Sequence, residues 1–313
     1  GRAVYHFNRL TRPGRDACLR MFSASKEKKK DTAGKRSDLP EQSVPLNTDS
    51  HDTLGSEPLS TVSPAPKPAP RKNKKRWSLD DFEVVELPGR SRFHDFPVDL
   101  RVMRGIASQE FKYCTPIQEK GLPLVLDGRD LIGRAQTGTG KTAVFLIGLY
   151  CRLLQDSNTW PEKGHPRALI IAPTRELVIQ IAKEGRKLGT FTPLNIVGIY
   201  GGADYQKQQD MMMRRRCDII VATPGRLLDF IGKRTIILDC CKALVIDEAD
   251  RMLDMGFIPD VRRILGYLPS KDERQTMLFS ATITDDVRRL AAQWCRDPVS
   301  VEAGEKTVNV YQI

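Results

Sequence analysis

A glycine-rich stretch at residues 135–142 constrains this chain more than any other feature of its sequence. It follows an apolar run at 130–134 and precedes a helix-period segment at 142–154. Gly138 and Gly140 allow consecutive backbone N–H groups to turn inward around phosphate oxygens, and the start of the following helix adds its positive end. The order of strand, loop and helix therefore predicts a phosphate-binding loop. The alternative interpretation, a glycine-rich turn without a ligand, fits this order less well.

The polar side chains of this loop suit a nucleotide bound with a metal ion. Lys141 places a cation on the β- and γ-phosphates, and the Thr142 hydroxyl reaches Mg²⁺. The first position departs from the usual pattern, because it holds alanine in place of glycine. The candidate nucleotide-binding residues of the loop are Ala135, Gln136, Thr137, Gly138, Thr139, Gly140, Lys141 and Thr142.

Short apolar runs alternate with helix-period segments along the rest of the chain. Most of these runs are rich in Ile, Val and Leu without polar alternation, as expected for strands covered on both faces. We predict an α/β fold with a doubly wound, mostly parallel sheet, whose ligands bind beyond the carboxyl ends of the strands. The predicted strands are 130–134, 168–172, 196–200, 218–222, 243–247 and 276–280, and the predicted helices are 142–154, 175–188, 261–268 and 285–295.

Acidic residues follow the predicted strand at 243–247, in the order Asp247, Glu248, Ala249, Asp250. A carboxylate at the end of a buried strand costs free energy unless it meets a cation or water. We expect Asp247 to coordinate Mg²⁺ through water, and Glu248 to orient or deprotonate a water that attacks the γ-phosphate. An acidic helix start is the alternative explanation, since carboxylates stabilise helix N-termini.

With these two motifs the sequence resembles the DEAD-box ATP-dependent RNA helicases, over about residues 93 to 298. The resemblance implies a RecA-like domain that uses ATP and Mg²⁺ and contacts the RNA backbone with little sequence specificity. It also implies an adenine-reading element in which Gln118 and Thr115 bind the base and Phe93 packs on its ring. Glu110 stands where this element usually has glycine.

Three further motifs resemble the RNA-backbone elements of the family, and each follows a predicted strand. Their candidate RNA-binding residues are Thr174, Arg175, Gly201, Gly202, Thr223 and Arg226. A last motif, with Ser280 and Thr282, resembles the element that links nucleotide hydrolysis to unwinding, and its hydroxyls can bond Asp250. The residues around the motifs, at 166–173, 249–259 and 274–282, look most like the bacterial RhlB branch, which is linked to RNA degradation. The expected partners are therefore RNA and RNA-degradation proteins, and the expected location is the cytoplasm.

The positive charge of the chain is concentrated near its start. Residues 1–76 carry 17 Lys+Arg against 8 Asp+Glu, whereas residues 77–313 carry 33 against 31. Because this first segment is also rich in proline and lacks aromatic residues after position 26, we predict a disordered basic tail. Its lysine clusters either stay solvated or bind RNA phosphates. We assign residues 77–92 to a connecting segment and 93–303 to the RecA-like domain.

Both ends of the sequence raise expectations of their own. The chain starts at Gly1, so residues 1–20 are either a transit-like segment or sequence upstream of a start at Met21. Residues 304–313 resemble the beginning of a linker to the second RecA-like domain of the family, whose motifs do not occur after Thr282. We therefore expect this 313-residue chain alone to hydrolyse ATP poorly. An RNA clamp without unwinding activity and a DNA-acting helicase are the two alternative functions.

Cysteine and histidine give little sign of a further site. The seven Cys residues form no Cys-x-x-Cys pair, which argues against disulfides and against a zinc module. His94 and His165 lack metal-ligand spacing, so we expect both to be surface or packing residues. The Met211–Arg216 segment is basic at its end, and we interpret it as an exposed helix end, with a basic RNA-binding patch as the alternative. No apolar run approaches the roughly 18 residues that a membrane span needs.

Overall fold

The computed structural model describes residues 77–156, 162–214 and 216–302, together with the backbone of 310–312. The chain divides into two units, Gly1–Arg71 and Lys72–Ile313, and every described residue belongs to the second. The predicted disordered tail at 1–76 lies outside the described residues, as does most of the predicted linker at 304–313. No helix in the described part is long and apolar enough to span a membrane.

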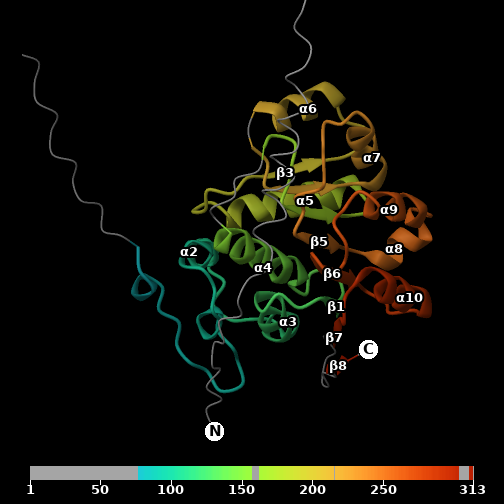
Figure 1. The fold of residues 1–313 in the computed structure, drawn as a ribbon. Coiled ribbons are helices and arrows are strands. Elements are labelled where there is room, and N and C mark those ends of the chain that lie inside the picture. The colour runs from blue at the N-terminus through green and yellow to red at the C-terminus, as the bar shows by residue number, and fades with distance from the viewer. Residues whose placement is uncertain (1–76, 157–161, 215, 303–309, 313) are drawn as a thin grey trace, which may run out of the picture. The chain divides into compact units, whose positions relative to one another are not determined.

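The centre of the described unit is an eight-stranded sheet with the order β3-β4-β2-β5-β6-β1-β7-β8 (Figure 1). Seven strands run parallel, and only β8 pairs antiparallel, with β7. The predicted α/β class with a mostly parallel sheet is therefore confirmed. The strands are β1 Leu131–Arg134, β2 Ala168–Ile171, β3 Ile196–Ile199, β4 Ile219–Ala222, β5 Ala243–Ile246, β6 Gln275–Ser280, β7 Val299–Glu302 and β8 Val310–Gln312.

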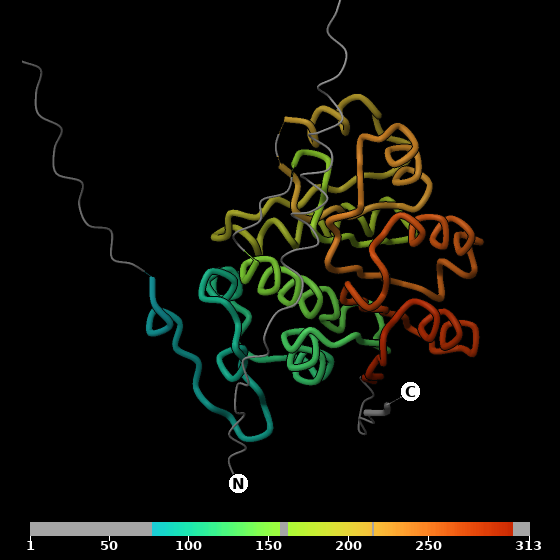
Figure 2. The backbone as a smooth tube through the Cα atoms, viewed as in Figure 1, coloured from blue at the N-terminus to red at the C-terminus, as the bar shows by residue number. Residues whose placement is uncertain are grey.

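All six predicted strands occur within one residue of their expected bounds, because each is a short apolar run between polar loops. The sequence pattern did not reveal β7 or β8. The run Val299-Ser-Val-Glu302 is short and half polar, yet it pairs in parallel with β1 through Leu131 and Val299. Figure 2 shows the result, in which β1, coloured green, lies among the orange and red strands from the end of the chain.

Helices cover both faces of the sheet, because neighbouring residues along each strand point to opposite sides. On β2, Ala168 and Ile170 face one buried cluster, and Leu169 and Ile171 face the other. The first cluster packs against α2 Leu100–Ser108, α3 Pro116–Leu126, α4 Lys141–Gln155 and α5 Arg175–Leu188. The second packs against α6 Tyr205–Arg214, α7 Pro224–Gly232, α8 Ala249–Asp254, α9 Ile258–Leu265 and α10 Asp285–Trp294.

The four predicted helices are present, with one shifted start. The helix expected at 261–268 is α9, which begins three residues earlier and ends at Leu265. Its early start follows from Pro259, which is tolerated in the first turn because the N–H groups there have no partner inside the helix. Within residues 77–99, which the structure describes, two short 3-10 helices precede α2: η2 Leu79–Asp81 and η3 Phe93–Asp95.

Candidate nucleotide and RNA site

The predicted motifs lie at one edge of the sheet, where the carboxyl ends of the parallel strands meet. The phosphate loop follows β1, the acidic motif follows β5, and the motif with Ser280 and Thr282 ends β6. These three strands are adjacent in the sheet. The three motifs that hold the candidate RNA-binding residues, called RNA-type below, follow β2, β4 and β3. These strands are adjacent to one another on the other side of β5. One half of the edge therefore carries the nucleotide-type residues and the other half carries the RNA-type residues.

The phosphate loop has the backbone conformation that its glycines were expected to provide. Gly138 and Gly140 have φ angles of 84° and 92°, in the left-handed region that favours glycine. Gln136 and Thr137 are exposed, whereas Ala135 is buried and bonds β6 through its N–H. Lys141 and Thr142 open α4, where the helix N-terminus adds positive potential.

A buried ion pair joins the phosphate loop to the acidic motif. Lys141 Nζ lies 3.0 Å from Asp247 Oδ1, and their side chains are 4% and 0% exposed. Among the described residues, Lys141 Nζ has no hydrogen-bond partner besides this pairing, and Asp247 Oδ2 has none at all. Burial raises the pKa of Asp247, and the Lys141 ammonium opposes that rise. Because buried polar atoms normally have partners, these unused atoms fit a bound polyphosphate and a cation.

Those observations agree with the predicted Mg²⁺ and ATP ligands. The unused oxygen of Asp247 can accept hydrogen bonds from the waters of a hydrated Mg²⁺ ion, which keeps several waters when proteins bind it. The two ammonium hydrogens of Lys141 that do not face Asp247 can bind phosphate oxygens. Thr142 lies one residue beyond Lys141 on the first turn of α4, the position from which the predicted hydroxyl ligand would act.

Glu248 occupies an unusual backbone conformation at the start of α8. Its φ and ψ are 54° and 53°, in the left-handed region that costs a non-glycine residue about 1–2 kcal/mol. Its side chain is 14% exposed, and Oε2 lies 3.3 Å from Arg251 Nη1. Its backbone N–H donates to Asp247 Oδ1 at 3.0 Å. Such strain occurs at functional sites, and here it accompanies the bond from the Glu248 N–H to Asp247.

Gln118 connects the predicted adenine-reading element with the phosphate loop. Its Oε1 accepts from the Thr115 N–H at 2.9 Å, and its Nε2 donates to the Gly140 carbonyl at 3.1 Å. A Cβ added at Gly140 would lie 2.4 Å from Gln118 Nε2, so only glycine allows this close approach. The Thr115 hydroxyl is buried without a partner among the described residues. The two predicted residues are therefore held together at the loop, while their contact with adenine stays a prediction.

Phe93 lies elsewhere than the resemblance implied for an adenine-stacking ring. Its side chain is 0% exposed and belongs to the core cluster beneath α2, α3 and α4. A ring with no exposed face cannot stack on a base in this arrangement, so here Phe93 supports the fold. Its predicted contact with adenine requires a local movement of η3 and remains a prediction.

Asp250, on α8 just after β5, is joined to the end of β6 by three hydrogen bonds. Its Oδ2 accepts from the Thr282 N–H at 2.9 Å and from Thr282 Oγ1 at 3.0 Å, and its own N–H donates to Ser280 Oγ at 3.1 Å. The predicted contact between Asp250 and both hydroxyls is therefore confirmed. Burial acts to raise the pKa of Asp250, but hydrogen bonds from Thr282 and Ser280 outweigh it and hold that pKa below its usual value.

Replacing Thr282 with valine should weaken this link and change its pH dependence. A carboxylate with a lowered pKa in the folded state stabilises the protein above the unfolded pKa, and that stability is lost as the pH falls through the folded pKa. We expect the variant to be less stable than the unmodified chain at pH 7, and the difference to shrink as the pH falls below about 4. Urea unfolding across this pH range measures the difference. A gap that stays constant with pH would contradict the assignment.

The RNA-type half of the edge begins with Thr174 and Arg175. Thr174 caps α5, because its hydroxyl accepts from the Leu177 N–H at 3.3 Å. Arg175 is exposed, and its guanidinium carbon lies 5.2 Å from the centre of the Tyr200 ring, which can hold the cation by its π-face. Gly201 and Gly202 follow β3, are both exposed, and leave the backbone open next to this arginine.

Arg226 has a different environment from Arg175. Both of its terminal nitrogens donate to the Ala203 carbonyl at 3.2 Å, and its side chain is 12% exposed. Thr223 precedes it as the N-cap residue of α7 and bonds β3 through its N–H. Arg226 therefore holds the glycine loop in place, a role that the sequence could not reveal because its partner is a backbone carbonyl.

Comparison with known proteins agrees with the family resemblance that the motifs indicated. A family model described as DEAD/DEAH box helicase matches residues 115–290. The chain belongs to this helicase family. It is 55% identical over 229 residues to the "ATP-dependent RNA helicase RhlB" of Pseudomonas aeruginosa (strain UCBPP-PA14), covering 72% of this chain and 57% of that protein.

Other relatives of this DEAD/DEAH helicase chain have names of the same kind. The "ATP-dependent RNA helicase RhlB" of Pseudomonas putida (strain KT2440) is 54% identical over 72% of this chain and 57% of its own length. The "ATP-dependent RNA helicase CshA" of Listeria monocytogenes is 44% identical over 69% of this chain and 40% of its own length. The predicted resemblance to the RhlB branch is confirmed. The chain spans about half the length of these curated relatives.

Proposed function

We propose that this chain is the ATP-binding and RNA-binding part of an ATP-dependent RNA helicase. The observation that carries the proposal is the division of one sheet edge, with nucleotide-type residues after β1, β5 and β6 and RNA-type residues after β2, β4 and β3. From the RhlB resemblance we extend the proposal to RNA degradation in the cytoplasm, with RNA-degradation proteins as partners.

The nucleotide half can bind ATP and direct a water molecule at its γ-phosphate. Lys141 and the loop amides neutralise phosphate charge, and Thr142 and Asp247 would hold Mg²⁺, which supplies further charge neutralisation when bound. Glu248 lies next to Asp247 and carries the carboxylate that can accept a proton from the attacking water. Gln118 has both a donor and an acceptor, as recognition of adenine requires.

The RNA half can bind a strand through its phosphates and sugars. Exposed arginine, helix N-termini and threonine hydroxyls contact the backbone and do not read bases, so little sequence specificity is expected. The link between the halves is the Asp250 network, since Asp250 belongs to the acidic motif after β5 and its partners end β6. If ATP binding moved this network and changed the affinity for RNA by some factor, RNA binding would change the affinity for ATP by the same factor.

Substitutions of Arg175 and Arg226 should affect RNA binding in different ways. Arg175→Ala removes an exposed cation, so we expect weaker binding of single-stranded RNA and a salt slope (log affinity against log salt concentration) that is shallower by about 0.7. Arg226→Ala should also weaken binding, because the Ala203 carbonyl loses its partner, but it should leave the salt slope nearly unchanged. Fluorescence anisotropy at several salt concentrations gives both numbers. Equal changes in slope for the two variants would contradict the distinction between them.

The proposed activity is tested by unwinding. We would join the chain to the carboxyl-terminal remainder of the Pseudomonas aeruginosa relative and measure ATP-dependent strand separation of a short RNA duplex and of a DNA duplex of the same sequence. The proposal expects separation of the RNA duplex only. ATP-dependent RNA binding without separation would favour an RNA clamp, and equal activity on DNA would favour a DNA-acting helicase.

A further inference from the structure

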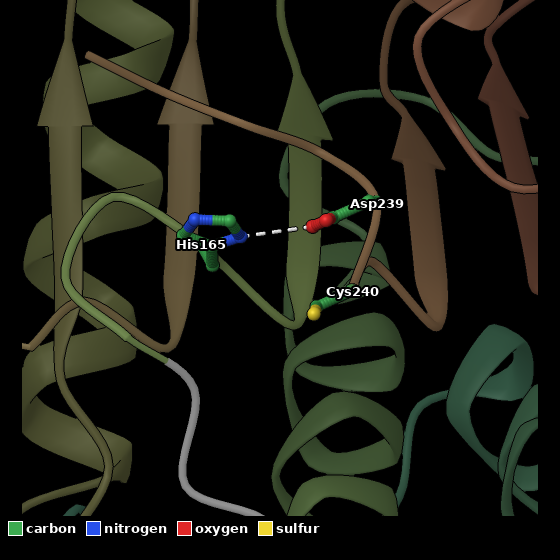
Figure 3. Close-up of side chains that lie close together, drawn as sticks. All are labelled: His165, Asp239 and Cys240. Atoms are coloured by element: carbon green, nitrogen blue, oxygen red, sulfur yellow. Dashed lines mark hydrogen bonds and ion pairs between the residues drawn. The ribbon is translucent and has the colours of Figure 1, made fainter. Parts of the chain in front are cut away.

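Three potential metal ligands meet at the opposite edge of the sheet from the nucleotide and RNA residues. His165 lies in the loop that leads into β2, and Asp239 and Cys240 lie in the loop that leads into β5 (Figure 3). His165 Nδ1 lies 2.9 Å from Asp239 Oδ1, and the ligand atoms of all three residues lie within 4.8 Å of one another. No local sequence pattern indicated this cluster, because His165 precedes Asp239 and its neighbour Cys240 by 74 positions or more.

The two loops are held in register by backbone contacts on both sides of the cluster. The Ile237 N–H donates to the Gly164 carbonyl at 2.9 Å, and the Lys242 N–H donates to the Arg167 carbonyl at 2.8 Å. Gly164 has a φ of 83°, and a Cβ there would lie 2.6 Å from the Thr235 carbonyl oxygen. The backbone hydrogen bonds between the two loops therefore fix the positions of the three side chains relative to one another.

The donor set indicates which ion would bind. An imidazole nitrogen, a thiolate sulfur and a carboxylate oxygen are together the ligands that zinc takes, whereas Mg²⁺ and Ca²⁺ prefer oxygen alone. Tetrahedral zinc with bonds of 2.0–2.3 Å places its ligands roughly 3.3–3.8 Å apart. Separations of up to 4.8 Å reach this range by small side-chain rotations. His165 is partly exposed and Asp239 is well exposed, so an ion can enter from solvent.

We propose that His165, Asp239 and Cys240 form a zinc site that fastens the loop before β2 to the loop before β5. Water completes the fourth position. These two strands are neighbours, and they lead to Arg175 and Asp247, at the boundary between the RNA half and the nucleotide half. The site lies at the amino ends of the strands, so its ion stabilises the sheet and does not take part in hydrolysis. The alternative is a His165–Asp239 hydrogen-bonded pair that binds no metal.

The test uses the whole 313-residue chain, freed of metal with a chelator, and measures Zn²⁺ affinity by competition with a chromophoric chelator in excess Mg²⁺. His165→Gln and Cys240→Ser each remove one ligand, and Cys114→Ser, which removes a half-buried thiol outside the cluster, is the matched control. We expect at least about tenfold weaker binding in the first two variants and no change in the control. Equal affinity in all four proteins, or no binding in the unmodified chain, would overturn the proposal.

Two further readouts are independent of activity. Co²⁺ in place of Zn²⁺ should give a thiolate-to-metal charge-transfer band in the unmodified chain and in Cys114→Ser, but not in Cys240→Ser. Zn²⁺ should raise the melting temperature of the unmodified chain and leave that of the two ligand variants unchanged, because an ion that binds only the folded state stabilises it. A Co²⁺ spectrum without the band, or equal thermal shifts in all variants, would also contradict the site.

Discussion

Replacing Lys141 with alanine is expected to weaken ATP binding by roughly 100-fold, because a buried charged group loses its hydrogen bonds to phosphate. The same change should destabilise the fold. Asp247 is 0% exposed, and removal of one partner from a buried ion pair costs about 3–5 kcal/mol. Uptake of a proton by Asp247 reduces this cost, since burial already raises its pKa. Calorimetric titration with ATP and Mg²⁺, together with urea unfolding, measures the two effects.

A double variant separates these two effects. In Lys141→Ala/Asp247→Asn a neutral amide replaces the orphaned carboxylate, so stability should recover in part while ATP binding stays lost. Lys207→Ala removes an exposed lysine on α6 and serves as the matched control, with both properties unchanged. A folded Lys141→Ala chain that binds ATP as tightly as the unmodified chain would show that the loop is not the nucleotide site.

Replacing Glu248 with glutamine should slow ATP hydrolysis by about 10²–10⁴-fold and leave ATP affinity nearly unchanged. Glutamine keeps the shape of the side chain and the strained start of α8, but it cannot accept a proton from water. The chain joined to the remainder of the Pseudomonas aeruginosa relative is the suitable protein, because the chain spans 57% of the length of that relative. Release of labelled phosphate at saturating RNA gives the rate.

The control for this change lies on the same helix. Asp254→Asn removes an exposed acid at the end of α8 and should leave the rate unchanged. Hydrolysis that survives in Glu248→Gln would assign proton removal to another group. Loss of ATP binding in that variant would instead make Glu248 part of the binding site.

The sequence predicted the sheet and the phosphate loop well because both depend on local patterns. A fully buried parallel strand must be apolar along its length, and a loop that surrounds phosphate needs glycine where φ is positive, as at Gly138 and Gly140. β7 escaped prediction because Ser300 interrupts a run of four residues, and its pairing with β1 depends on the completed sheet.

Contacts made between distant parts of the chain were harder to predict. The pairing of Asp250 with Thr282 was expected only from the family resemblance, and the complete burial of Phe93 had no signal in the sequence. The hydrogen bond from Arg226 to the Ala203 carbonyl cannot be predicted from the sequence, because every residue has a backbone carbonyl. The cluster at His165 depends on two loops that only the fold brings together.

The central claim is that one edge of the sheet binds ATP on one half and RNA on the other. Amide hydrogen exchange measured by mass spectrometry on the 313-residue chain tests this directly, because it locates backbone protection along the sequence. ATP with Mg²⁺ should protect residues 135–142 and 247–250, and a saturating oligouridine should protect residues 174–177, 200–203 and 223–226. Protection by RNA only outside these three segments, or by ATP away from the phosphate loop, would contradict the account.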